Sequence, residues 1–234
     1  MPLDFIIDQW AVWPPLPADE PTPDRGLNQV PALLRRRLSP LAKNVVRAIE
    51  PCLNGDVPIP AVFSSCHGEL AKTFAMMQQL EAGEEISPTS FSLSVHNAIA
   101  GLFSMIWRNK LECTVLAPGE EGIAPAFIEA AGLFSEGAEQ VLLVFYDDPL
   151  VPFYPAAPYK LSVDRSLAFA MRVAKQGGRE ALRLTQLPVA GDDGEQPVQL
   201  PIFIEFLSNP ETTSLVLKTA RHSWRWEKIG RLAD

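Results

Sequence analysis

Five consecutive apolar residues at positions 141–145, VLLVF, constrain the fold of this chain more than any other segment. A short run without a polar residue is typical of a strand covered on both faces, as in a parallel sheet packed between helices. A segment with apolar residues at helical spacing separates this run from a second strand-like segment, residues 114–116. Strands that alternate with helices predict an α/β fold with a mostly parallel sheet covered by helices.

The residues before this region continue the same alternation. Ser39 followed by Pro40 is a helix-start signal, because serine caps free N–H groups and proline fits the first helical position. The apolar pattern predicts a strand at residues 61–63, a helix over residues 70–80 with one apolar face, and a helix over residues 94–109.

Beyond Pro158 the pattern changes to strand-like segments, residues 167–173, 182–187 and 202–207. We expect these strands to be added to the same sheet, some of them antiparallel, and Trp224 and Trp226 to anchor an edge. The length of 234 residues suits one domain, with an N-terminal part over residues 1–158 and C-terminal strands over residues 159–234.

The composition excludes several classes of function. A net charge of −8 argues against a general nucleic-acid binder, which needs a basic face. The acidic N-terminus and the polar residues within the apolar stretch 91–107 argue against a signal peptide and a membrane span. Three cysteines without a CxxC pair indicate free thiols in a reducing compartment, so we expect a cytoplasmic protein.

Two groups of residues suggest nucleophilic catalysis. Cys66 and His67 are adjacent, but neighbours at the end of a strand point to opposite faces and do not form a nucleophile–base pair. Ser92 and Ser94 precede His96 without a G-x-S-x-G turn, and serines before a helix are usually caps. We expect structural roles, with an acyl transferase or hydrolase built on one of these Ser/Cys–His pairs as the alternative.

The sequence predicts no cofactor and no metal site. Its three histidines form no metal-binding pair, and no glycine-rich phosphate motif follows a strand. One basic cluster stands out in this acidic chain, namely Arg35-Arg36-Arg37 with Lys43 and Arg47. Such a cluster is usually solvated surface, and it also suits an acidic carrier protein.

The segment from residues 86–88 (ISP) to residues 97–101 (NAIAG) resembles the stretch before the nucleophile strand of β-ketoacyl synthases. The strand at residues 113–117 (CTVLA) follows in the same order. The turn that carries the reactive cysteine in those enzymes here reads PGEEG, with Gly119 at the position of the missing nucleophile. The resemblance implies a thiolase-like fold over roughly the first 150 residues, and a partner subunit rather than an independent catalyst.

Three further segments are similar to the short β-ketoacyl synthase-like chain length factors of bacterial aryl polyene clusters: residues 64–69 (SSCHGE), 91–98 (FSLSVHNA) and 223–226 (SWRW). This resemblance implies a heterodimer in which a full-length β-ketoacyl-ACP synthase carries the catalytic residues and extends an acyl chain on a carrier protein. The present subunit would then shape the acyl tunnel and have no catalytic residue of its own. A purely structural stabiliser of the ketosynthase is a third possibility.

The same resemblance nominates two sets of residues. In ketosynthases the strand before the nucleophile pairs with the partner, which implies an interface formed by Asn97, Gly101, Cys113, Thr114, Val115 and Leu116. Residues before the asparagine reach the partner's tunnel, which implies chain-length roles for Ser90, Phe91 and Val95, with Cys66 and His67 at a neighbouring turn. The i, i+4 spacing of Phe91 and Val95 equally fits ordinary core contacts.

Overall fold

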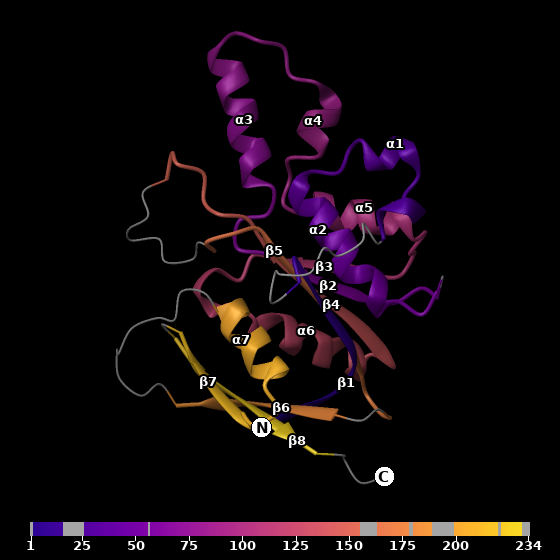
Figure 1. The fold of residues 1–234 in the computed structure, drawn as a ribbon, viewed down its shortest axis with the longest axis vertical. Helices are drawn as coiled ribbons and strands as arrows, with labels where there is room; N and C mark the ends of the chain where they lie inside the picture. The colour runs from indigo at the N-terminus through magenta and orange to yellow at the C-terminus, as the bar shows by residue number, and fades with distance from the viewer. Residues whose placement is uncertain are drawn as a thin grey trace.

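A computed structural model describes residues 2–15, 26–55, 57–154, 163–177, 180–188, 199–219 and 221–230. Within these residues one eight-stranded sheet has the order β3-β2-β4-β5-β1-β6-β8-β7, and helices lie on both of its faces (Figure 1). The strands are β1 (Leu3–Trp13), β2 (Ala61–Ser64), β3 (Cys113–Leu116), β4 (Gln140–Asp147), β5 (Leu167–Ala174), β6 (Glu180–Leu187), β7 (Ser214–Lys218) and β8 (Ser223–Ile229). The α-helices are α1 (Ala32–Arg35), α2 (Pro40–Ile49), α3 (Leu70–Glu81), α4 (Pro88–Ser92), α5 (Ala98–Ile106), α6 (Ala124–Ser135) and α7 (Gln199–Ser208).

The α/β class is confirmed, but the parallel part of the sheet is smaller than the sequence predicted. Strand β2 is parallel to both β3 and β4, and the other neighbouring pairs are antiparallel. Parallel neighbours require a crossover connection, which α3 to α5 supply between β2 and β3. Helix α6 then connects β3 to β4, which lies on the other side of β2. The C-terminal strands do complete the same sheet, as expected. The boundary proposed at Pro158 lies outside the described residues.

Two hydrophobic cores lie on opposite faces of the sheet, and β4 contributes to both. Val141, Leu143 and Phe145 pack toward α6 and α7. Leu142, Val144 and Tyr146 pack toward α2 and α5. Because successive side chains of a strand point to opposite faces, a strand buried on both sides is apolar throughout. This arrangement explains the continuous apolar run in the sequence.

Three predicted elements differ in the structure. Residues 202–207 belong to helix α7, because Leu200, Phe203 and Ile204 form a buried helical face at i, i+3 and i+4. The helix predicted over residues 94–109 is shorter and begins at Ala98, after the separate helix α4. Strand β8, with its two tryptophans, lies between β6 and β7 and is not an edge.

Helices α3 and α4 form a hairpin, residues 70–92, that stands away from the sheet (Figure 1). No residue of α3 is buried, although its apolar spacing predicted a packed face. Met77 and Leu80 are 56% and 59% exposed. The part of the apolar face of α3 formed by Met77 and Leu80 is therefore exposed, whereas Phe74 packs against Phe153, with ring centroids 5.4 Å apart.

Candidate functional site

The carboxyl ends of the parallel strands β2, β3 and β4 meet at one side of the fold, where α/β sheets usually place their ligand sites. Asp147, the last residue of β4, accepts hydrogen bonds from the Ser65 hydroxyl (2.8 Å) and from the N–H groups of Cys66 (3.2 Å) and His67 (3.1 Å). Ser65 Oγ also accepts the N–H of Gly68 at 2.7 Å. One carboxylate therefore fixes the turn that follows β2.

Cys66 is half-buried in this turn, and its thiol donates to the carbonyl oxygen of Gly119 at 3.7 Å. Burial and, second, the negative charge of Asp147 raise the pKa of the Cys66 thiol far above its usual value. The thiolate is the reactive form of cysteine. A thiol that stays protonated at neutral pH favours the structural role predicted for Cys66.

The turn after β3 contains Gly119, which the family resemblance places at the position of the missing nucleophile. Gly119 begins a short 3₁₀ turn, η3 (Gly119–Glu121), with a φ of +55°. In the same turn Glu121 Oε2 accepts the Thr219 hydroxyl at 3.2 Å and lies 3.1 Å from His222 Nδ1. These contacts attach the turn to the connection between β7 and β8.

The tunnel candidates Ser90, Phe91 and Val95 lie on the surface. Ser90 and Phe91 belong to α4 and Val95 follows it, and the exposed fractions of Phe91 and Val95 are 61% and 42%. The interpretation of Phe91 and Val95 as core contacts is therefore wrong, because the described chain does not enclose them. Both side chains are free to meet a partner.

The serines around α4 do not have the capping role that the sequence suggested. Ser92 donates its hydroxyl to the carbonyl oxygen of Thr89 at 2.9 Å, and Ser94 donates to that of Phe91 at 2.8 Å. The first residue before α5 is Asn97, whose side chain makes no capping hydrogen bond. The serine hydroxyls therefore satisfy carbonyl groups near the end of α4.

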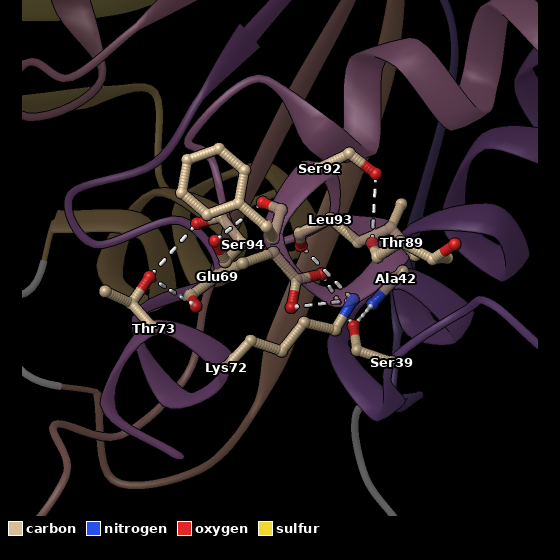
Figure 2. A network of polar contacts seen from close by, with 10 residues as sticks. Ser39, Ala42, Glu69, Lys72, Thr73, Thr89, Ser92, Leu93 and Ser94 are labelled. Carbon is tan, nitrogen blue, oxygen red and sulfur yellow. Dashed lines mark hydrogen bonds and ion pairs between the residues drawn. The ribbon is translucent and has the colours of Figure 1, made fainter. Parts of the chain in front are cut away.

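A polar network holds the base of the α3–α4 hairpin (Figure 2). Ser39 accepts the N–H of Ala42 at 2.9 Å, as predicted for a helix cap, and donates to Glu69 Oε1 at 2.7 Å. Lys72 Nζ lies 3.4 Å from both Glu69 Oε2 and the carbonyl oxygen of Leu93. The network therefore joins α2, α3 and the segment after α4, which positions the exposed residues of that segment.

His96 connects the tunnel candidates to the turn after β2. Its Nε2 atom lies 2.9 Å from the carbonyl oxygen of Ser65, and its ring packs on Gly68, which has a φ of +57°. The structure thus brings the Cys66-His67 turn beside the segment that carries Val95. Gly119 contacts the same turn through Cys66.

The predicted interface residues lie on an exposed helix face and on a free sheet edge. Asn97, directly before α5, and Gly101 on α5 are exposed at i, i+4, and Met105 continues this face. Strand β3, with half-buried Cys113, Thr114, Val115 and Leu116, pairs with β2 on one side and is the last strand of the sheet within the described residues. Its outer backbone groups are unpaired within that part of the chain, a feature typical of an edge that pairs with another chain.

Among the described residues no group of three or more His, Cys, Asp and Glu side chains is placed to hold a metal ion. None of the helices in the same part of the chain combines the length and apolar character that a membrane crossing requires.

The mixed sheet, its helices on both faces and the turn at the carboxyl ends of β2 and β3 define a thiolase-like α/β domain. The chain belongs to the family described as the N-terminal domain of β-ketoacyl synthases, whose sequence profile matches residues 8–227. The family resemblance predicted from residues 86–122 is thereby confirmed. No curated protein matches the sequence.

Three solved structures are similar to this chain. A structure of the ketosynthase ApeO in complex with its chain length factor ApeC, from Xenorhabdus doucetiae, matches with a TM-score of 0.75 and 23% identity over 96% of this chain and 99% of that chain. The ishigamide ketosynthase/chain length factor matches with a TM-score of 0.45 and 14% identity, over 72% of this chain and 52% of that chain. A β-ketoacyl synthase from Burkholderia phymatum matches with a TM-score of 0.44 and 15% identity, over 62% and 44%.

Three residues of this region were missed by the sequence reasoning. Asp147 organises the turn after β2. The sequence indicated this role, because Asp147 comes directly after the run VLLVFY and so lies at the carboxyl end of a buried strand. Glu69 is 4% exposed at the base of the hairpin, and Gln199 is 5% exposed beside the turn after β3. No local sequence pattern indicates that the side chain of Glu69 or Gln199 is buried, because the burial of both follows from packing between distant segments.

Proposed function

We propose that this chain is a non-catalytic chain length factor that forms a heterodimer with a full-length β-ketoacyl-ACP synthase and shapes its acyl tunnel in polyene biosynthesis of the aryl polyene type. The observation that carries the proposal is the turn after β3, which contains no cysteine in a chain that belongs to the β-ketoacyl synthase family. We assign Gly119 in this turn to the position of the nucleophile. The nearby thiol of Cys66 has a raised pKa and does not replace that nucleophile.

The free edge of β3 and the exposed face of α5 support pairing with a ketosynthase. Backbone groups of an unpaired edge strand bind a strand of another chain, and the half-buried side chains of β3 suit a covered interface. The similar Xenorhabdus structure is a ketosynthase in complex with its chain length factor, in agreement with this assignment. We assign Asn97, Gly101 and residues 113–116 to the interface.

Exposure of apolar side chains supports the tunnel assignment. Phe91 and Val95 lie at the surface on a segment held by the Ser39–Glu69–Lys72 network. Large exposed apolar side chains mark surfaces that another molecule covers. We assign Ser90, Phe91 and Val95 to the wall of the partner's tunnel, with Cys66 and His67 supporting this wall from the turn after β2.

The basic cluster supports a contact with an acidic acyl carrier protein. Arg35, Arg36 and Lys43 line an open surface groove of about 340 Å³ between α1 and α2. Arg36 and Arg37 are exposed and form no ion pair with a carboxylate of the described residues. Positive charge in an otherwise acidic chain favours encounter with an acidic partner.

Co-expression with a ketosynthase of an aryl polyene cluster tests the proposal. We expect the two chains to purify as one complex, and the length distribution of the product to depend on this subunit. The cysteines of the described residues are free, which agrees with a cytoplasmic complex. A complex whose product length never responds to this subunit would favour the structural stabiliser, and stable acylation of the isolated chain would favour the acyl transferase or hydrolase.

A further inference from the structure

The cavity at the carboxyl ends of β2, β3 and β4 is small. Its volume is about 50 Å³, and residues from segments far apart in the sequence line it, among them Cys66, Gly119, Asp147 and Gln199. Pockets that bind small molecules usually measure about 300 to 1,000 Å³. The remaining space suits a few water molecules and is too small for an acyl chain.

Gln199 occupies one wall of this cavity from the first position of α7. Its side chain is buried, and its Oε1 atom accepts the N–H of Ile123, directly before α6, at 3.3 Å. An N–H group at the start of a helix lacks a partner within the helix, so it is available to bind an oxygen atom from elsewhere. The side-chain carbonyl oxygen of Gln199 accepts this N–H group.

Gly122 leaves space for the Gln199 side chain because it has no side chain of its own. Its φ is +66°, and a Cβ atom added at this position would overlap the carboxamide of Gln199. A residue without a side chain is therefore required for two reasons, the backbone conformation and the space that the amide fills. Gln199 lies directly on the backbone of the turn.

Helix α7 is held firmly behind this contact. Phe203 is fully buried, with ring centroids 5.8 Å from Phe127 and 4.9 Å from Trp226. Leu200 and Ile204 are buried in the same core. Because these aromatic contacts fix the helix, the position of Gln199 at its start is fixed as well.

The geometry points to Gln199 as a side chain that closes the chain's own pocket at the carboxyl ends of β2 to β4, so that no acyl ligand enters it. The inference goes beyond the chain length factor role and does not depend on it. It means that an acyl chain held by a complex lies outside this pocket. Shortening Gln199 opens the pocket toward Cys66.

Alkylation of the native cysteines by iodoacetamide, resolved by peptide mass spectrometry, tests this inference on the full chain. We expect Gln199→Ala to increase the rate at Cys66 by at least about ten-fold, since the enlarged cavity then admits the reagent. Gln199→Met keeps a side chain of similar length and should stay within about two-fold of the wild-type rate. Gln79→Ala, on the exposed face of α3, is the matched control and should leave the rate unchanged.

Cys52 separates local opening from general unfolding, because it is fully buried in the other core. The rate at Cys52 should stay unchanged in Gln199→Ala. An unchanged rate at Cys66, an equal rise in Gln199→Met, or an equal rise at Cys52 and Cys66 would each overturn the inference.

A second measurement does not depend on alkylation. Gly122→Ala should lower the Tm more in the wild-type background than in Gln199→Ala, because the second background removes the overlap and leaves only the backbone strain. Equal losses in both backgrounds would show that Gln199 does not lie on Gly122 in solution. Neither measurement involves a ketosynthase, so failure here and failure of the proposed function are distinguishable.

Discussion

The Ser39 hydroxyl donates a hydrogen bond to the Glu69 carboxylate, with 2.7 Å between the two oxygen atoms, and so joins the start of α2 to the base of the α3–α4 hairpin. Glu69 is nearly inaccessible to solvent. Burial raises the pKa of Glu69, and the favourable contacts with Ser39 and Lys72 offset this effect only in part. The charged form of Glu69 is therefore disfavoured in the folded protein.

The raised pKa of Glu69 sets the direction of its effect on stability. The folded state holds the Glu69 proton more firmly than the unfolded state, whose glutamate pKa is about 4.3. Stability is therefore lost as the pH rises from that value through the raised pKa. We expect Glu69→Gln, which keeps an oxygen acceptor for Ser39, to raise the free energy of unfolding at pH 7 and to change it little near pH 4.

Urea unfolding at the two pH values measures this effect, and Glu81→Gln on the exposed end of α3 is the matched control. A Glu69→Gln variant that is less stable than wild type at pH 7 would contradict the prediction.

Much of the sheet could be predicted from the sequence, because strands buried on both faces and helix-start signals are local patterns. The run VLLVF and the Ser39-Pro40 pair both have the predicted structure. Antiparallel pairing and the helical state of α7 depend on contacts between distant strands and on packing against Phe127 and Trp226. The order of the sheet therefore could not be derived from local periodicity.

The positions of the candidate residues in the fold could be predicted in part. The glycine at position 119 was visible in the sequence, since it occupies an identifiable turn after a strand. The exposure of Phe91 was not visible in the sequence, because an i, i+4 apolar pair looks the same whether a helix packs on its own core or on another chain. The contact between Gly122 and Gln199 joins two residues that are 77 positions apart in the sequence, and no sequence motif connects them.

The isolated chain is expected to remain unacylated after incubation with a short acyl thioester. Gly119 offers no nucleophile, and the raised pKa of Cys66 keeps its thiol protonated. Intact-mass spectrometry measures the outcome, with Cys66→Ser as a comparison that should give the same spectrum. A stable adduct that disappears in Cys66→Ser would assign a nucleophilic role to this cysteine.

The free edge of β3 is expected to be essential for partner binding. Val115→Asp places a charge in a half-buried strand of the proposed interface, and obligate interfaces commonly bury more than about 2,000 Å². Co-purification with the ketosynthase should be lost. Val216→Asp on β7, at the opposite edge of the sheet, is the matched control and should leave the complex intact.

Circular dichroism of both variants separates lost binding from lost folding. Equal recovery of the two complexes would remove β3 from the interface.

Reversal of the charge in the basic cluster is expected to weaken the productive encounter with the carrier protein. Arg36→Glu with Arg37→Glu removes two positive charges and adds two negative ones at an exposed surface. With about 0.2 to 1 kcal/mol for each exposed pair, KM for the carrier protein should rise roughly ten-fold at low salt. Arg221→Glu, exposed between β7 and β8, is the control, and a KM that responds equally to both changes would contradict a specific docking surface.

Side-chain volume at Phe91 and Val95 is expected to set product length in the complex. If these residues end the tunnel, Phe91→Ala and Val95→Ala should lengthen the polyene, whereas Ser90→Phe and Val95→Trp should shorten it. Because Phe91 is 61% exposed in the isolated chain, its truncation should change the stability of this subunit by only about 0.5 kcal/mol. The absorption maximum of the product reports the length, moving red for longer polyenes and blue for shorter ones.

Leu33→Ala is the matched control for these substitutions, because Leu33 on α1 is as exposed as Phe91 and lies outside the assigned wall. It should leave the spectrum unchanged. Recovery of the complex, measured for every variant, separates an altered tunnel from a weakened interface. Well-assembled variants at Ser90, Phe91 and Val95 that all give the wild-type spectrum would show that this segment does not limit chain length, and would leave stabilisation of the ketosynthase as its role.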